Sequence, residues 1–158
     1  MMKPIKVLML SLLFGAGAAN AAGADAEVVE VYKTPWCGCC TAWVDHLEAN
    51  GFEVKVHKIE DLAPLKQKLG VPSSLQSCHT AEVGGYTFEG HVPAEDMQRV
   101  LKEKPDVQGL AVPGMPIGSP GMETGGEPDR YDVIQFGQKG QSVYSSHVGL
   151  REPPSGKH

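Results

Sequence analysis

Three of the four cysteines in this chain stand within four residues, in the stretch Pro35-Trp36-Cys37-Gly38-Cys39-Cys40. The fourth, Cys78, is followed directly by His79. A single buried cysteine packs like a small hydrophobic side chain, but packing does not explain three cysteines crowded together. The stretch therefore indicates a chemical site around which the rest of the chain is organised.

The spacing of these cysteines leaves three interpretations open. Cys37 and Cys40 have the C-x-x-C spacing of redox dithiols, which makes them the candidate catalytic pair of a thiol–disulfide oxidoreductase. Cys39 lies outside that pattern and is poorly placed to pair with Cys40, because adjacent Cα atoms are only about 3.8 Å apart. The extra thiol favours a thiolate metal site, holding Cu(I) or zinc. A structural zinc or disulfide protein is the third interpretation, although the spacing is not that of a zinc finger.

Further candidate ligands lie outside the cysteine stretch. His79 follows Cys78, and His91 stands just before a predicted helix. Met115 and Met122 lie in a loop rich in proline and glycine, where a thioether ligand for Cu(I) is an alternative to apolar packing. Three other histidines are expected to lie on the surface or to cap helices rather than bind a metal. They are His46, His57 and His147.

The N-terminus has the pattern of a secretory signal peptide, which we assign to residues 1–21. Lys3 and Lys6 precede a short apolar run, and Ala19-Asn20-Ala21 fits a small-x-small cleavage site. The apolar run is too short to span a bilayer comfortably, so we expect no membrane attachment after cleavage. The mature chain would then work in an oxidising compartment, where free thiols need protection by pairing or by metal.

The charge of the chain limits the classes of partner it can bind, and its length limits the number of domains. The formal net charge is −5, and removing the signal peptide brings it to about −7. An acidic protein of this kind is not expected to bind nucleic acid or an anionic membrane surface. The mature length fits one domain, which we place at residues 26–146, followed by a flexible tail at 147–158.

The hydrophobic pattern predicts an α/β fold. Strand, helix and turn signals give the order β-α-β-α-β-β-α up to residue 104, with the first helix over 40–50 and a hairpin turn at Gly84-Gly85. This is the order of a thioredoxin-like domain, in which the reactive loop follows the first strand and faces a proline before the third; Pro72 is the candidate. Five prolines and six glycines in residues 105–128 predict an ordered but irregular loop, and 131–145 a C-terminal β-hairpin.

Several motifs in one order resemble the CopG family of bacterial periplasmic copper-resistance proteins, over residues 27–136. They are Tyr32-Lys-Thr-Pro-Trp-Cys-Gly-Cys-Cys40, Ser77-Cys-His-Thr80, Gly90-His-Val-Pro93 and Gly109-Leu-Ala-Val-Pro-Gly-Met-Pro-Ile-Gly-Ser-Pro-Gly-Met-Glu123.

The resemblance implies a thioredoxin-like fold, a periplasmic location and a copper site built from the cysteines. It also implies a role in copper resistance by redox interchange of Cu(I) and Cu(II), which would make the chain a copper oxidoreductase. We expect this protein to be a monomer, and its expected partners are copper ions and other periplasmic copper-handling proteins. The full set of expected metal ligands is Cys37, Cys39, Cys40, Cys78, His79, His91, Met115 and Met122.

Overall fold

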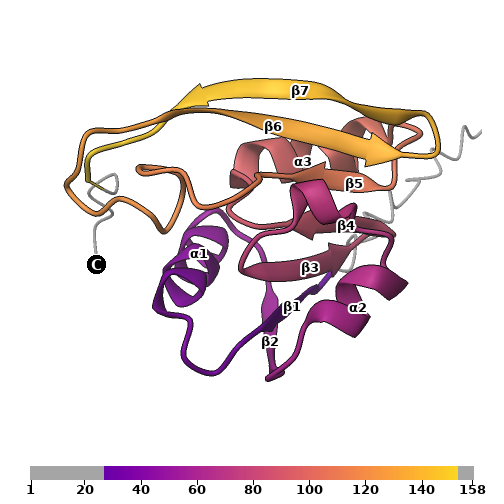
Figure 1. Ribbon diagram of the computed structural model, residues 1–158, viewed down its shortest axis with the longest axis horizontal. Helices are drawn as coiled ribbons and strands as arrows, with labels where there is room; N and C mark the ends of the chain where they lie inside the picture. The colour runs from indigo at the N-terminus through magenta and orange to yellow at the C-terminus, as the bar shows by residue number, and fades with distance from the viewer. Residues whose placement is uncertain (1–26, 153–158) are drawn as a thin grey trace, which may run out of the picture.

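A computed structural model describes residues 27–152 of the chain, and the predicted signal peptide lies outside that range. One seven-stranded sheet, ordered β2-β1-β3-β4-β5-β6-β7, forms the centre of the fold (Figure 1). Within the described range, no helix is both long enough and apolar enough to cross a membrane. The elements in chain order are β1 (Val29–Lys33), α1 (Gly38–Ala49), β2 (Val54–Lys58), α2 (Ala63–Lys68), η1 (Ser73–Leu75), β3 (His79–Val83), β4 (Tyr86–Glu89), α3 (Ala94–Glu103), β5 (Gly109–Ala111), β6 (Arg130–Gly137) and β7 (Gly140–Val148).

The predicted α/β class and the predicted order of elements up to α3 are both confirmed. β1 and β2 run parallel, as expected for two strands joined through a helix, and β3 and β4 form the antiparallel hairpin. The classification of this order of elements as thioredoxin-like stays a prediction. Pro72 caps η1, and the residue directly before β3 is Cys78.

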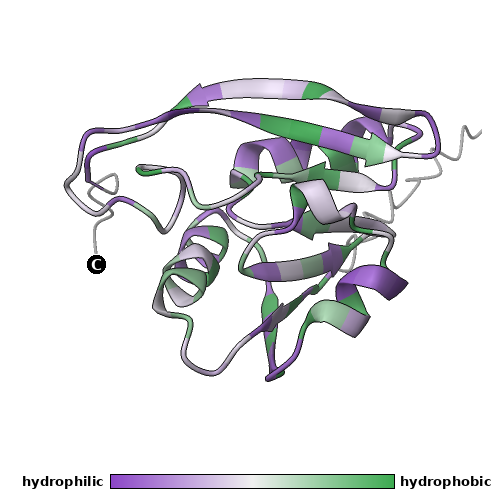
Figure 2. Cartoon of the chain, in the orientation of Figure 1, coloured by the Kyte–Doolittle hydropathy of each residue, from purple (hydrophilic) through white to green (hydrophobic). Residues whose placement is uncertain are grey.

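The sheet has a hydrophobic core on each face. On one face, Val29 and Val31 of β1 pack in the same cluster as Trp43 of α1 and Met97 of α3. The other face is covered by the segment from α2 to η1, where Val71 and Leu75 pack with Ala111 and Phe136. Figure 2 shows hydrophobic stretches along α1 and the strands that supply these clusters. Two covered faces hold the loops at the end of the sheet in fixed positions.

The expectation of a wholly irregular segment over residues 105–128 is wrong at β5. This strand pairs in parallel with β4 and antiparallel with β6, so it joins the C-terminal hairpin to the main sheet. Leu110 and Ala111 are fully buried, which explains why a stretch rich in proline and glycine also carries apolar residues. β7 also continues to Val148, beyond the predicted end of the hairpin at residue 145, and Leu150 N donates a hydrogen bond to Gly118 O.

The fit of β5 between its neighbours gives a testable prediction. A Cβ atom at Gly109 would lie 1.8 Å from Thr87 O, so Gly109→Ala must push β5 away from β4. We expect a loss of about 1–3 kcal/mol in the free energy of unfolding, measured by chemical denaturation. Gly38→Ala is the matched control, since nothing lies within 4 Å of its added Cβ. Equal stability of the two variants would contradict this account of β5.

Candidate metal centre

The N-terminus of α1 presents the cysteine stretch at one end of the sheet. Cys37 caps the helix, and its Sγ accepts a hydrogen bond from Cys40 N at 3.3 Å. Cys40 is fully buried on the core side of the helix, whereas Cys37 and Cys39 are partly exposed. Free amide groups and the helix dipole at this end favour a thiolate over a thiol. The local sequence therefore gathers three sulfur atoms at the N-terminus of a helix.

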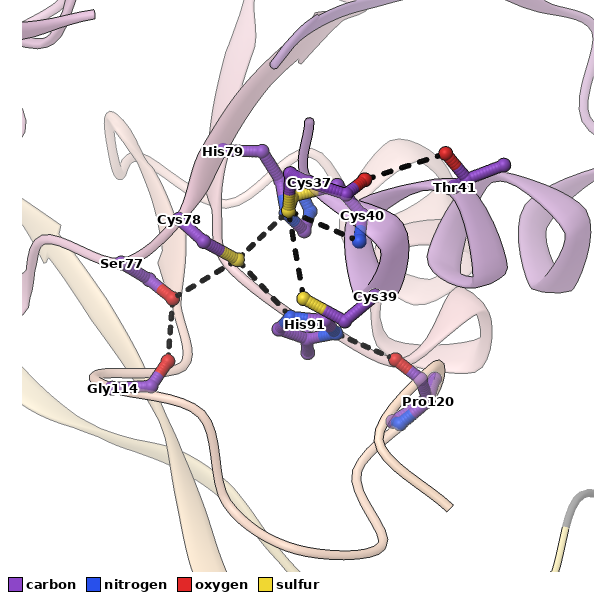
Figure 3. The surroundings of a disulfide bond; sticks show 10 residues. All are labelled: Cys37, Cys39, Cys40, Thr41, Ser77, Cys78, His79, His91, Gly114 and Pro120. Atoms are coloured by element: carbon purple, nitrogen blue, oxygen red, sulfur yellow. Dashed lines mark hydrogen bonds between the residues drawn. A yellow bond between two sulfur atoms is a disulfide. The ribbon is translucent and has the colours of Figure 1, made fainter. Parts of the chain in front are cut away.

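Cys78 joins this stretch from the turn before β3. The Sγ atoms of Cys37, Cys39, Cys40 and Cys78 all lie within 4.8 Å of one another. Cys37 and Cys40 form a disulfide bond, and Cys39 and Cys78 are free (Figure 3). Cys37 Sγ also lies 3.5 Å from Cys39 Sγ. The structure thus brings together all four cysteines that the sequence analysis selected, with two of them in the oxidised form.

A second donor set shares Cys78 with the first. Cys78 Sγ lies 3.3 Å from His79 Nδ1 and 3.1 Å from His91 Nε2. The other nitrogen of His91, Nδ1, lies 2.7 Å from the carbonyl oxygen of Pro120. A proton on Nδ1 would donate to that oxygen and leave the Nε2 lone pair directed at the site. Cys78, His79 and His91 therefore form a mixed sulfur–nitrogen set that can hold a metal ion.

Burial controls the protonation of this mixed set. It lowers the pKa of His79 well below its usual value, with further contributions from His91 and the nearby Lys66 charge. Burial also lowers the pKa of His91, against the opposing effect of its hydrogen bond to Pro120. Both imidazoles are therefore neutral at pH 7, the form that binds metal. Burial and then the neighbouring Cys39 raise the pKa of Cys78 to about 11, so a metal ion binding there must displace a proton.

His79 also has the one buried side-chain nitrogen or oxygen in residues 27–152 that lacks a hydrogen-bond partner, its Nε2. Its ring packs against the indole of Trp43, with 4.3 Å between the ring centroids. The nitrogen that faces Cys78 is Nδ1, so Nδ1 is the atom of His79 placed to bind a metal ion together with Cys78. The donor chemistry of Cys78, His79 and His91, one sulfur with two imidazoles, fits a metal ion.

The proline- and glycine-rich loop lies over the site, as Figure 3 shows for its Gly114 and Pro120. Ser77 Oγ donates a hydrogen bond to Gly114 O at 2.5 Å, and Pro120 O faces His91. Gly121 approaches α1 so closely that a Cβ there would lie 2.8 Å from Cys39 O, and its φ of +85° also favours glycine. In both hydrogen-bond contacts, the loop uses a backbone carbonyl oxygen and no side chain. Met115 is 52% exposed and Met122 partly buried, and a ligand role for either sulfur stays a prediction.

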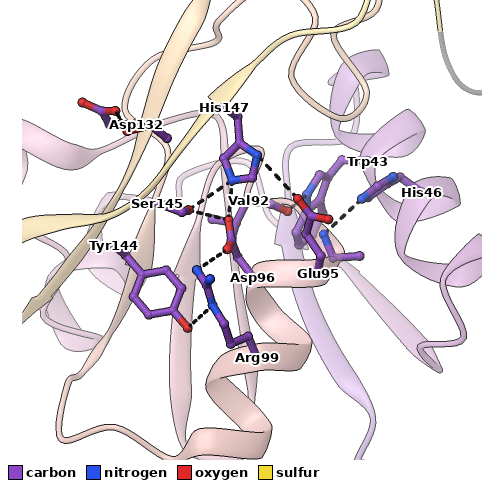
Figure 4. Close-up of polar contacts among 12 residues, drawn as sticks. Trp43, His46, Val92, Glu95, Asp96, Arg99, Asp132, Tyr144, Ser145 and His147 are labelled. Atoms are coloured by element: carbon purple, nitrogen blue, oxygen red, sulfur yellow. Dashed lines mark hydrogen bonds and ion pairs between the residues drawn. The ribbon is translucent and has the colours of Figure 1, made fainter.

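The remaining histidines considered above make contacts within the fold. His46 Nε2 accepts a hydrogen bond from Ala94 N at the start of α3, and His57 pairs with Glu30. His147 Nε2 contacts both Asp96 and Ser145 (Figure 4). His147 Nδ1 lies 3.5 Å from Glu95 Oε1, so this histidine links β7 to the first turn of α3.

The sequence analysis missed the residues that support the site. Glu89 is fully buried, and its carboxylate binds Lys66, Thr80 and the backbone N–H of Ser77. In the sequence, Lys66 looks like a solvent-exposed charge on a short helix, and Glu89 like the polar end of a strand. Only the pairing of β3 with β4 and the position of α2 bring them together.

The fold is α/β with one mixed sheet, and cysteines and histidines gather at one end of that sheet. This arrangement defines a protein with a candidate thiolate–imidazole metal centre. A family model described as a protein of unknown function, DUF411, matches residues 75–122. No curated protein matches the chain.

Two solved structures, titled copper resistance protein CopG forms 1 and 2, are similar to this fold. Form 1 is 46% identical with a TM-score of 0.72, over 77% of this chain and 98% of that one. Form 2 is 45% identical with a TM-score of 0.74, over 78% and 99%. The chain belongs to the CopG family of copper resistance proteins, which confirms the family named from the motifs.

The buried histidines give a prediction for metal-free protein. His79 has a lowered pKa in the fold and about 6.5 when unfolded, so the unfolded chain binds its proton first as the pH falls. The lowered pKa of His79 therefore stabilises the folded state above pH 6.5, and this stabilisation is lost as the pH falls below 6.5. We expect the free energy of unfolding to fall between pH 7 and pH 5, and to fall less steeply in His79→Leu, which cannot take up that proton. Parallel curves for the two proteins would show that His79 is not the group responsible.

Proposed function

We propose that this protein binds copper through the two donor sets that meet at Cys78, and that it interconverts Cu(I) and Cu(II) in copper resistance. The titles of the related structures support copper as the metal. The observation that carries the proposal is the sharing of one thiol between an all-cysteine set and a cysteine–histidine set. We further propose that the mature chain works in the periplasm as a monomer, and that other copper-handling proteins deliver and accept the ion.

The two sets differ in the copper ion that they suit. Thiolates are soft ligands and select Cu(I), and four of them can bridge more than one ion. Imidazole nitrogens suit Cu(II), and a site of two histidines and one cysteine is a known geometry for copper redox centres. An ion that changes its oxidation state can therefore exchange partners around Cys78 while the shared thiolate stays bound.

Cys37 and Cys40 are the proposed redox pair. When both are reduced, each thiol can give up one proton and one electron, so that a disulfide forms and two Cu(II) ions become two Cu(I) ions. A dithiol reductant must then restore the pair through thiol–disulfide exchange. Its thiolate would attack Cys37, which is partly exposed, because Cys40 is fully buried. In the proposed cycle, the disulfide between these two residues would be the oxidised state, in which Cys39 and Cys78 are the remaining thiols of the all-cysteine set.

A thiol–disulfide oxidoreductase is the second candidate function. The disulfide at the N-terminus of α1 favours it, because this position activates cysteines in redox proteins. That function needs only Cys37 as the attacking thiol and Cys40 as the resolving one. It gives no role to Cys39, Cys78 or the two histidines beside Cys78.

Replacing Cys39 separates the two candidates. We expect reduced wild-type protein, titrated without oxygen, to take up Cu(I) tightly against a Cu(I) chelator and in preference to zinc. Cys39→Ser should bind Cu(I) more weakly by about tenfold or more, since it removes one thiolate of the set. The same variant should reduce insulin disulfides at the wild-type rate. An efficient disulfide reductase whose copper uptake is unchanged by Cys39→Ser would establish the second function instead of the first.

The methionines of the covering loop form a separate prediction. If either thioether binds Cu(I), Met115→Leu or Met122→Leu should weaken binding or shift the ultraviolet absorption of the Cu(I) complex, because the sulfur is lost at similar volume. Thermal stability should change little in the exposed Met115 variant, so its copper affinity can be read directly. Unaltered affinity and absorption in both variants would leave the loop a packing role only.

A further inference from the structure

A buried ion pair lies beneath the candidate metal centre, on the face of the sheet covered by α2. Lys66 Nζ lies 2.5 Å from Glu89 Oε1, and their side chains are 6% and 0% exposed. Thr80 joins the pair: its hydroxyl donates to Glu89 Oε2 at 2.6 Å and lies 2.9 Å from Lys66 Nζ. Both charges are therefore hydrogen-bonded as well as paired.

Stability alone is a weak reason for such a pair. Removing two charges from water costs several kcal/mol for each, and well-packed apolar residues in place of a buried ion pair are often neutral or stabilising. The contact that apolar residues would not reproduce is the one to the backbone. Ser77 N donates to Glu89 Oε1 at 2.6 Å, and Ser77 is the residue before Cys78.

Ser77 is held from three directions. The Glu89 carboxylate binds its N–H, and the covering loop accepts its hydroxyl hydrogen at Gly114 O. On the third side, Gly90 comes so close that a Cβ there would lie 2.7 Å from Ser77 Cβ. Cys78 follows this fixed residue and belongs to both donor sets, so the position of Ser77 determines where the shared sulfur lies.

We propose that Glu89, with its charge balanced by Lys66, is a positioning residue that sets Cys78 in the copper centre through the backbone N–H of Ser77. The inference rests on the proposed function, because it concerns the ligand common to both donor sets. Outer residues that orient metal ligands typically contribute about ten- to a hundredfold to metal affinity. Glu89 holds a ligand's backbone neighbour, and Lys66 is the partner of opposite charge for this buried side chain.

Two double variants test the proposal while avoiding an unpaired buried charge. Lys66→Met/Glu89→Gln retains an acceptor for Ser77 N and a donor for Thr80, whereas Lys66→Met/Glu89→Leu removes both. The probe is Cu(I) alone, titrated into reduced protein against a chelator. We expect the leucine variant to bind Cu(I) about ten- to a hundredfold more weakly and the glutamine variant to stay close to wild type. Equal affinities in the two variants, whether both retained or both lost, would overturn the proposal.

A remote buried carboxylate supplies the control for a purely structural effect. Asp96 is buried between α3 and β7, where it binds Arg99, Ser145 and His147. Asp96→Asn should lower the thermal stability and leave copper affinity unchanged. If Asp96→Asn weakens copper binding as much as the leucine variant, the effect of Glu89 is only structural and the proposal fails.

The backbone contact can also be removed from the other partner, should the leucine variant not fold. Ser77→Pro lacks the N–H, and Gln76 already has the extended ψ of 142° that a residue before proline adopts. Ser77→Ala keeps the N–H and loses only the hydroxyl. Weaker Cu(I) binding in the proline variant than in the alanine variant supports the proposal, and equal binding overturns it. Absence of Cu(I) uptake by the wild type would instead overturn the proposed function itself.

Discussion

The antiparallel pairing of β1 with β3 determines where every cysteine of this protein lies. Lys33, the last residue of β1, is opposite His79, the first residue of β3. The loop that leaves β1 and the turn that enters β3 therefore meet at the same end of the sheet. The β3–β4 hairpin extends the arrangement, since Gly90 N bonds to His79 O and His91 follows at once. These two pairings thus bring donors from three separate segments together at one end of the sheet.

This site is built into the core, with one side open to the covering loop. Cys40 and His79 are fully buried, and His79 packs against Trp43, which belongs to the main hydrophobic cluster. Polar groups are costly in such a place unless they are hydrogen-bonded or bind a ligand. The benefit is rigidity, because close packing fixes the positions of these two side chains. The fold itself therefore positions Cys40 and His79 within the candidate centre.

Local sequence signals were sufficient where the cause of a structure is local. Gly84 and Gly85 both have positive φ, as a tight hairpin turn requires, and α1 has its C-cap at Asn50, the predicted last residue of the first helix. The clustering of Cys37, Cys39 and Cys40 follows directly from their spacing. β5 could not be found in this way, because Gly109-Leu-Ala becomes a strand only by pairing on both sides with β4 and β6. The contact of His91 with Pro120 and the burial of Glu89 depend on tertiary packing, which has no signature in a single sequence.

The position of β5 has a consequence for how this family can vary. β5 and β6 are neighbouring antiparallel strands, so residues 112–129 form a long connection whose two ends are fixed side by side in the sheet. Lengthening such a connection costs little conformational entropy, because the cost grows only with the logarithm of its length. Insertions and deletions in this connection therefore cost little chain entropy, while the elements beneath it, β1, β3 and α1, keep their geometry. The cover over the candidate site can thus change in length without a change in the sheet that carries the cysteines and histidines.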